Sequence, residues 1–235
     1  MEDDGFVLVR SKRKTREGKR LQTHPGLSRS YVISHDVEMS QDEICCVKER
    51  IIRCRDELSL HHVLIRIKNL LRPISGVTEI ICFGLGSVTG DESMYPSRYQ
   101  LALLLLLRDM FGNIPTSLYD PKFNRFDRQI LESYDLTVRP SNEDAAVRCR
   151  HKTLFFMPRC PFNLFTTLFR ANADSLSNVT VFGNELTHLR DVRYAPQSLA
   201  EKASQMMSTT RLDVTDSPLE NLLNDTALTY FSHLS

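Results

Sequence analysis

The sequence predicts an α/β fold: a Rossmann-like, doubly wound, mostly parallel sheet with N-terminal helices and a flexible basic N-terminal arm. The first observation is that short strand-like runs alternate with helical segments, a pattern typical of parallel sheets covered on both faces. The second is that strand candidates such as 78–83 and 178–182 are almost continuously apolar, as burial on both faces requires. The third is the length of 235 residues, which suits one sizeable domain, and we assign it to residues 41–235.

Residues 1–40 form the predicted arm, which we expect to be disordered because it is polar, basic and rich in turn residues. Seven Lys or Arg residues and a single acid, Glu17, fall between Arg10 and Arg20. This basic cluster predicts a solvated tail, a nuclear-import signal or a nucleic-acid contact. The whole chain has a formal net charge of only +1, so we expect nucleic acid as a partner only through residues 10–20.

Residues 41–71 are predicted to form two helices. An apolar stripe recurs at intervals of three and four in the first part of this segment. After Ser59 the stripe moves to nearly the opposite face, which predicts a break there, and Pro73 ends the second helix. The second stripe consists of Leu60, Val63, Leu64, Ile67, Leu70 and Leu71. His61 and His62 lack metal-ligand spacing, so we assign them surface or packing roles.

Strands and helices alternate after residue 77. The strands are predicted at 78–83, 116–119, 136–139, 153–157, 178–182 and 227–231. The helices are predicted at 97–110, 124–134 and 161–171, and Leu101–Leu107 is expected to be buried on all sides. We further expect a helix in the middle of 185–212, and a capping box at Ser217–Glu220 that starts a short helix ending near Leu223.

Composition excludes few classes of protein. Apolar residues make up 41% and charged residues 25% of the chain, as in ordinary soluble proteins. The longest apolar run has seven residues, against about 20 needed to cross a bilayer, and the first residues do not resemble a signal peptide. We therefore expect no membrane association and a location in the cytoplasm, the nucleus or both. The six cysteines lack paired metal-ligand spacing, so we interpret them as core thiols and predict no metal site.

The most informative local feature is a turn that directly follows the first strand of the alternation. Gly84 and Gly86 would let the backbone approach a ligand closely, because neither carries a Cβ. Ser87 follows them, and Ser97 and Arg98 open the next helix. A dinucleotide fingerprint would need a third glycine three residues on and an immediate helix, and the chain has neither. The turn therefore predicts either a ligand cradle or a tight structural turn.

Three other strand ends carry candidate ligand-binding residues. Asp120 ends the second strand, where an acid can hydrogen-bond ribose hydroxyls or cap the helix that begins near residue 124. Pro158 and Cys160 follow the fourth strand, and Cys160 is a candidate buried thiol, nucleophile or thiolate ligand of haem. Asn184 follows the fifth strand. The carboxyl ends of parallel strands meet at one edge of a sheet, so we predict that these loops share one pocket.

Seven blocks of the sequence occur in the order and spacing of a known family: CFGLGS, SRYQLALLLLL, YDPKF, NEDAAVR, TLFFMPRCP, NVTVFGN and LLNDTALTYF. Over about residues 42–232 the chain resembles the SRR-like (sensitivity to red light reduced) family. The resemblance implies a cytoplasmic and nuclear regulator of circadian-clock input with protein partners, and in animals a regulator of haem biosynthesis. Members of the family commonly carry His where this chain has Arg159, which argues against a role that needs imidazole at that position.

Two functions remain open. The first is a regulatory protein that acts through protein partners, with haem or a nucleotide as candidate ligands at the carboxyl edge of the sheet. The alternative is a nucleotide- or S-adenosylmethionine-dependent enzyme that uses the same crevice. We prefer the regulator, because a methyltransferase would carry an acid just before the first glycine, where this chain has Phe83. We predict no catalytic residue: Ser87, Asp120 and His188 have the residue types of a hydrolase triad but lack its Gly-x-Ser-x-Gly turn.

Overall fold

The computed structural model describes residues 38–90, 95–186, 206–215 and 219–232 of the chain. The basic cluster at 10–20, His188, most of the helix expected within 185–212, and the Ser217–Pro218 start of the predicted capping box lie outside these ranges. None of the helices in the described part is long and apolar enough to cross a membrane.

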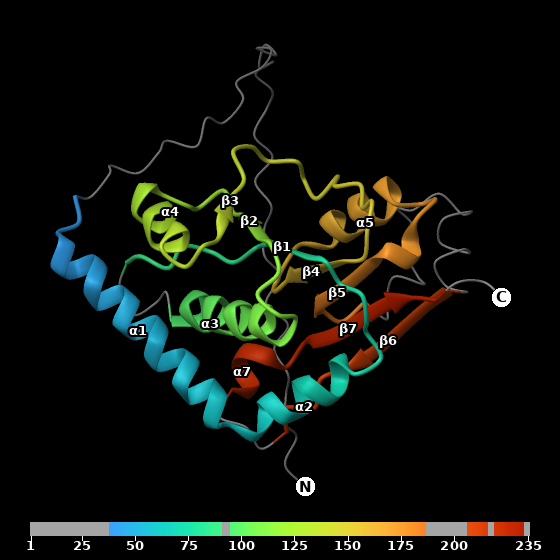
Figure 1. Cartoon of the computed structure of the whole chain (residues 1–235), viewed down its shortest axis with the longest axis horizontal. Coiled ribbons are helices and arrows are strands. Elements are labelled where there is room, and N and C mark those ends of the chain that lie inside the picture. Colours follow the sequence, from blue (N-terminus) through green and yellow to red (C-terminus); the bar gives the residue numbers. More distant parts are fainter. Residues whose placement is uncertain (1–37, 91–94, 187–205, 216–218, 233–235) are drawn as a thin grey trace, which may run out of the picture. The chain divides into compact units, whose positions relative to one another are not determined.

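Within the described ranges, seven strands form one mixed sheet in the order β3-β2-β1-β4-β5-β7-β6. Their bounds are β1 Glu79–Phe83, β2 Thr116–Tyr119, β3 Thr137–Val138, β4 Thr153–Met157, β5 Val179–Asn184, β6 Met207–Arg211 and β7 Thr226–Phe231. Strands β1 to β5 run parallel to one another, whereas β7 is antiparallel to both β5 and β6 (Figure 1). The predicted mostly parallel α/β sheet is confirmed.

Helices cover both faces of this sheet. Their bounds are α1 Gln41–Leu60, α2 His62–Leu71, α3 Tyr95–Met110, α4 Arg125–Glu132, α5 Phe162–Ala171 and α7 Glu220–Leu223, with a short 3₁₀ turn at Leu176–Asn178. In β1, Ile80 and Cys82 pack into the core with α1 to α4, while Ile81 and Phe83 pack into the core with α5. Figure 1 shows α3 and α5 on opposite sides of the strands. Successive residues of a strand point to opposite faces, so a strand buried on both faces is apolar throughout.

The break between the N-terminal helices lies at His61, two residues beyond the predicted position. His61 is the N-cap of α2, and its Nδ1 accepts a hydrogen bond of 3.2 Å from the Val63 N–H. The role is thus capping, which the surface-or-packing interpretation did not include. Leu60 does not belong to the second apolar stripe, because it is 90% exposed at the end of α1.

Strand β6 is the clearest omission of the sequence-based assignment, which predicted no strand between residues 182 and 227. Its sequence, MSTTR, has a single apolar residue and lacks the alternation of apolar and polar residues that would predict a strand. The strand forms because β7 offers it a free edge, and the hydroxyls of Thr209 and Thr229 lie 3.1 Å apart across the pair. Helix α7 ends at Leu223 as predicted, but its N-cap is Leu219, which makes no side-chain cap.

Candidate functional site

The loops after β1, β2, β4 and β5 lie at the carboxyl edge of the sheet, where ligands bind in open α/β folds. Chain order reverses between β1 and β4, since β2 and β3 lie beyond β1 on one side and β5 lies beyond β4 on the other. This topological switch point is where such folds open a crevice. Hydrogen bonds join the loop after β2 to the loop after β1, and the loop after β4 to the end of β1, whereas a pocket shared by these loops stays a prediction.

Neighbouring protein groups leave no room for a side chain at Gly84 or Gly86. Both have left-handed backbones, with φ of +75° and +76°. A Cβ on Gly84 would lie 2.6 Å from the Cys160 Sγ and 3.0 Å from the Pro158 carbonyl oxygen. A Cβ on Gly86 would lie 2.6 Å from the Ser97 Oγ. The loop after β4 therefore occupies the space beside the first glycine, and the start of α3 occupies the space beside the second.

Asp120 links the loop after β2 to the loop after β1. Its Oδ2 accepts a hydrogen bond of 2.8 Å from the Gly86 N–H, and its Oδ1 accepts one of 2.8 Å from the Lys122 N–H. The side chain is buried, with the residue 6% exposed. Asp120 is not a helix cap, because Asn124 fills that position for α4. Asp120 was predicted to hydrogen-bond a ribose or to cap a helix. Its carboxylate instead accepts hydrogen bonds from two backbone amides.

Asp127 is the residue at this edge that the sequence analysis missed. It is fully buried on α4. Its Oδ1 accepts hydrogen bonds from the Ser87 hydroxyl and from the Val88 and Thr89 N–H groups at 2.9–3.0 Å. Its Oδ2 accepts one from the Asn124 N–H at 3.0 Å, which completes a capping box. The Asn-x-x-Asp spacing at 124–127 is the signal that could have identified it.

Arg98 fixes the far end of the same loop. It is 2% exposed, and it donates from Nε to the Val88 carbonyl at 3.0 Å and from Nη2 to the Gly90 carbonyl at 2.7 Å. Charge-assisted hydrogen bonds of this kind are about twice as strong as neutral ones. The segment from Ser87 to Gly90 is therefore held by a carboxylate from α4 and a guanidinium from α3.

Cys160 is a buried, protonated thiol that joins three strands. Its Sγ donates to the Phe83 carbonyl at 3.3 Å, and its backbone N–H donates to the Asn184 Oδ1 at 3.2 Å. Burial, with a smaller contribution from the nearby Asp120 carboxylate, raises the pKa of the thiol to about 12. A nucleophile or a thiolate ligand needs the opposite shift, so the residue does not fit catalysis or haem ligation. The geometry favours the buried structural thiol among the three interpretations.

Arg159 adopts a left-handed backbone, with φ of +52°, in the turn between Pro158 and Cys160. Its Nη2 donates to the Asn221 carbonyl of α7 at 2.9 Å. The loop after β4 is thus connected to β1, to β5 and to α7. Within the described ranges no group of three or more His, Cys, Asp or Glu side chains could hold a metal ion.

The nine predicted residues are therefore brought to one edge, where the contacts described above join them to one another and to the backbone. Hydrogen bonds from neighbouring loops engage both carboxylates, the Arg98 guanidinium, the Cys160 thiol and the Asn184 amide oxygen. The Asp120 Oδ2 already accepts from the Gly86 N–H, and the residue is only 6% exposed. Chemically, the arrangement builds a rigid edge from mutual hydrogen bonds.

A family model described as the SRR1 domain matches residues 63–231. Over 125 residues, half of this chain, the sequence is 32% identical to the protein SENSITIVITY TO RED LIGHT REDUCED 1 of Arabidopsis thaliana, covering 44% of that protein. Over 117 residues, 47% of this chain, it is 33% identical to an SRR1-like protein of Mus musculus, covering 45% of it. The chain spans less than half the length of these two relatives.

Among solved structures, the chain is similar to the S-adenosylhomocysteine-bound methyltransferase PaMTH1 of Podospora anserina. The match covers 86% of this chain and 100% of that one, with 10% identity and a TM-score of 0.42. A likeness at this level carries no argument about activity or ligand.

Proposed function

Because the chain belongs to the SRR1 domain family, we propose that it is a regulatory protein that acts in red-light and circadian-clock input through protein partners. The red-light setting comes from the name of the Arabidopsis relative, and the circadian-clock setting comes from the family resemblance. It also includes a regulatory link to haem biosynthesis and action in both cytoplasm and nucleus, as the family resemblance implies.

The observation that carries a regulatory role over catalysis is the mutual engagement of polar groups at the carboxyl edge. A general base must have its carboxylate available to the substrate proton, whereas Asp120 and Asp127 each accept hydrogen bonds from backbone amides. A cysteine nucleophile needs a lowered pKa, whereas burial raises the pKa of Cys160. These contacts give a stable framework on which partner-binding surfaces can be displayed.

Deletion of the gene in the source organism tests the regulatory proposal. We expect the deletion to change the phase or period of a clock-controlled transcript after red-light pulses, and to change cellular haem content. The full chain should restore both. Cys160→Ala should restore them equally, once its folding has been checked, because the thiol has no chemical role. A deletion without any effect on rhythm or red-light response would contradict the proposal, as would a folded Cys160→Ala protein without activity.

The proposed location has its own test. A fluorescent fusion of the full chain should appear in cytoplasm and nucleus, and removal of residues 10–20 should reduce the nuclear fraction. An unchanged distribution would discard the import role of that cluster.

The alternative function, a nucleotide- or S-adenosylmethionine-dependent enzyme, is favoured by one specific observation. The switch point between β1 and β4 carries the Gly84–Gly86 turn with its two left-handed glycines, and this is the usual place for a cofactor in a doubly wound sheet. A thermal-unfolding screen with S-adenosylmethionine, ATP, NAD(H) and NADP(H) distinguishes the two functions. A cofactor at 100 times its Kd would stabilise the fold by about 2.7 kcal/mol. The regulatory proposal predicts no such shift with S-adenosylmethionine, and a nucleotide that stabilises the fold without being consumed would be a regulatory ligand.

A further inference from the structure

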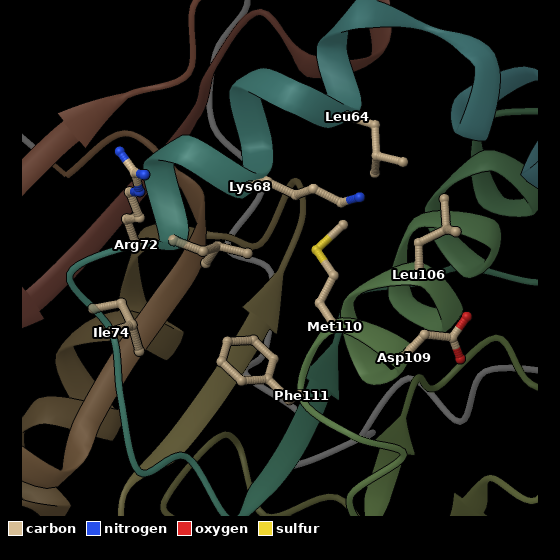
Figure 2. Close-up of a pocket in the computed structure, with 9 residues that line it drawn as sticks. Leu64, Lys68, Arg72, Ile74, Leu106, Asp109, Met110 and Phe111 are labelled. Atoms are coloured by element: carbon tan, nitrogen blue, oxygen red, sulfur yellow. The ribbon is translucent and has the colours of Figure 1, made fainter.

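A groove of about 610 Å³ lies between α2 and the C-terminal end of α3 (Figure 2). We call it the α2–α3 groove. It is lined by Leu64, Lys68, Leu71, Arg72, Ile74, Leu106, Asp109, Met110 and Phe111, none of which belongs to the carboxyl-edge loops. Its volume falls within the range of about 300–1,000 Å³ typical of small-molecule sites.

The walls of the α2–α3 groove are apolar because two helical stripes face each other. Leu64 and Leu71 are seven residues apart on α2, and Leu106 and Met110 are four apart on α3, so each pair lies on one face of its helix. Beyond α3, Phe111 closes one end of the groove, and its ring is only partly buried. The groove therefore offers a ligand accessible apolar surface.

One positive charge extends into this apolar space. Figure 2 shows the Lys68 side chain reaching from α2 toward Met110, with its ammonium over the gap between the helices. Within the part of the chain that the structure describes, no hydrogen bond or ion pair engages that ammonium. The single acid of the lining, Asp109, is neutralised by Arg55 through a contact of 2.5 Å. Arg72 lies at the end of α2 and adds to the positive potential, although its side chain points away from the gap.

We propose that the α2–α3 groove binds a small, free amphipathic carboxylate, with the carboxylate at the Lys68 ammonium and an apolar tail of about ten carbons among Leu64, Met110 and Phe111. An uncompensated cation beside apolar walls is complementary to this class of ligand. A neutral apolar compound would make no ion pair with the ammonium, which would stay in water. The site is separate from the carboxyl edge, so it does not depend on the proposed function.

The magnitudes expected follow from how open the groove is. Lys68 is exposed, and exposed ion pairs contribute up to about 1 kcal/mol, or about fivefold in affinity. Each methylene that is fully buried contributes about 0.8 kcal/mol, or about fourfold. The tail therefore supplies most of the affinity, and the carboxylate supplies orientation and discrimination against neutral analogues.

Isothermal titration of the full chain with decanoate, kept below its micelle concentration, tests the proposal. We expect saturable binding at one site, affinity about fivefold weaker for decanol, and affinity that falls by about two- to fourfold per methylene from decanoate to octanoate. Equal binding of decanol and decanoate would overturn the proposal, as would the absence of saturable decanoate binding. Binding seen only when phosphatidylcholine vesicles are present would also overturn it, because the ligand would then be a membrane surface.

Two variants and a control locate the site. Lys68→Met removes the charge but keeps the stem, and it should weaken decanoate about fivefold and leave decanol unchanged. Met110→Glu should abolish decanoate binding, because it places a carboxylate in the gap; Met110 is half-buried, and denaturant unfolding verifies that the variant folds. Lys122→Met changes an exposed lysine on the loop after β2 and should bind like the wild type. Unaltered affinity in Lys68→Met or Met110→Glu would overturn the assignment.

The wild type and Met110→Glu also test whether a second copy of the chain occupies the groove. Light scattering during gel filtration should give the same mass for the wild type and Met110→Glu. If the wild type forms a dimer that Met110→Glu dissociates, the groove is an interface between copies and the ligand proposal fails.

Discussion

The carboxyl edge of the sheet and the α2–α3 groove differ in whether their polar groups already have partners. At the carboxyl edge, Asp120, Asp127 and Cys160 hydrogen-bond to backbone groups of adjacent loops. In the groove, the described part of the chain supplies no partner for the Lys68 ammonium, and apolar side chains remain accessible around it. The edge has the topology of a ligand site, whereas the groove has an exposed cation beside accessible apolar side chains.

The comparison shows that the topological position of a site and the availability of its side chains for a ligand are separate properties. A buried polar group is stable only when it is hydrogen-bonded, and the edge meets that requirement internally. A ligand there would have to share acceptors that the loops already use. A ligand in the groove would add contacts without breaking any. Four predictions test whether the two regions differ in this way, and they are given in order of decreasing effect on stability.

The largest effect is expected from Gly183→Ala on β5. The new Cβ would lie 2.4 Å from the Met157 carbonyl oxygen, a backbone atom of the neighbouring strand that cannot move aside. We expect a loss of more than about 3 kcal/mol in the free energy of unfolding, at the upper limit of overpacking, measured by urea denaturation. Gly112→Ala is the matched control: its Cβ meets nothing within 4 Å, so only its φ of +82° costs about 1 kcal/mol. Equal midpoints for the two variants would show that the edge is not tightly packed.

The second effect concerns the buried carboxylate on α4. Asp127→Ala leaves the Val88 and Thr89 amides, together with the Ser87 hydroxyl, without their acceptor. We expect a loss of about 3 kcal/mol, since each buried unsatisfied donor costs about 1–3 kcal/mol and part of the loop can reach water. Asp174→Ala removes a carboxylate that is 85% exposed and should change stability by less than about 0.5 kcal/mol. Urea denaturation measures both. An Asp127→Ala protein as stable as the wild type would show that these hydrogen bonds do not stabilise the carboxyl edge.

The third effect is a dependence of stability on alkaline pH that arises from Cys160. Burial raises the pKa of its thiol from 9.0 to about 12 in the folded chain. Above pH 9 the unfolded chain releases a proton that the folded chain retains, so stability falls as the pH rises toward 12. Between pH 9 and pH 10, the wild type should lose about 1 kcal/mol more than Cys160→Ala. Parallel pH profiles of the two proteins would show that the thiol is accessible and ionised.

The smallest effect is expected in the groove. Lys68→Met should alter the free energy of unfolding by less than about 0.5 kcal/mol, because no contact within the described residues depends on the ammonium. Leu106→Ala, on the groove wall but buried, should cost about 3 kcal/mol. Thermal unfolding compares the two. A large loss in Lys68→Met would mean that the lysine is structural, and the contrast between the two regions would disappear.

The sequence by itself determined the parallel core of the fold and the place where its loops converge. The run at 153–157 is almost entirely apolar, and the segment Leu101–Leu107 is entirely apolar. Such local composition predicts burial on all faces, and both segments are buried. Gly84 and Gly86 likewise indicated a turn directly after the first strand, and both have positive φ values there. These features depend on neighbours in sequence, so a single chain is enough to identify them.

Tertiary structure alone decided what the polar residues do. The partners of Asp120 and Cys160 come from residues 34 and 77 positions away, and no local pattern specifies such pairs. Strand β6 forms because β7 provides an edge, although its own residues do not indicate a strand. The α2–α3 groove likewise exists because two stripes far apart in sequence face each other without closing. Hydrogen-bond partners, the pKa of a buried thiol and an open groove all depend on packing between distant segments, which sequence periodicity does not encode.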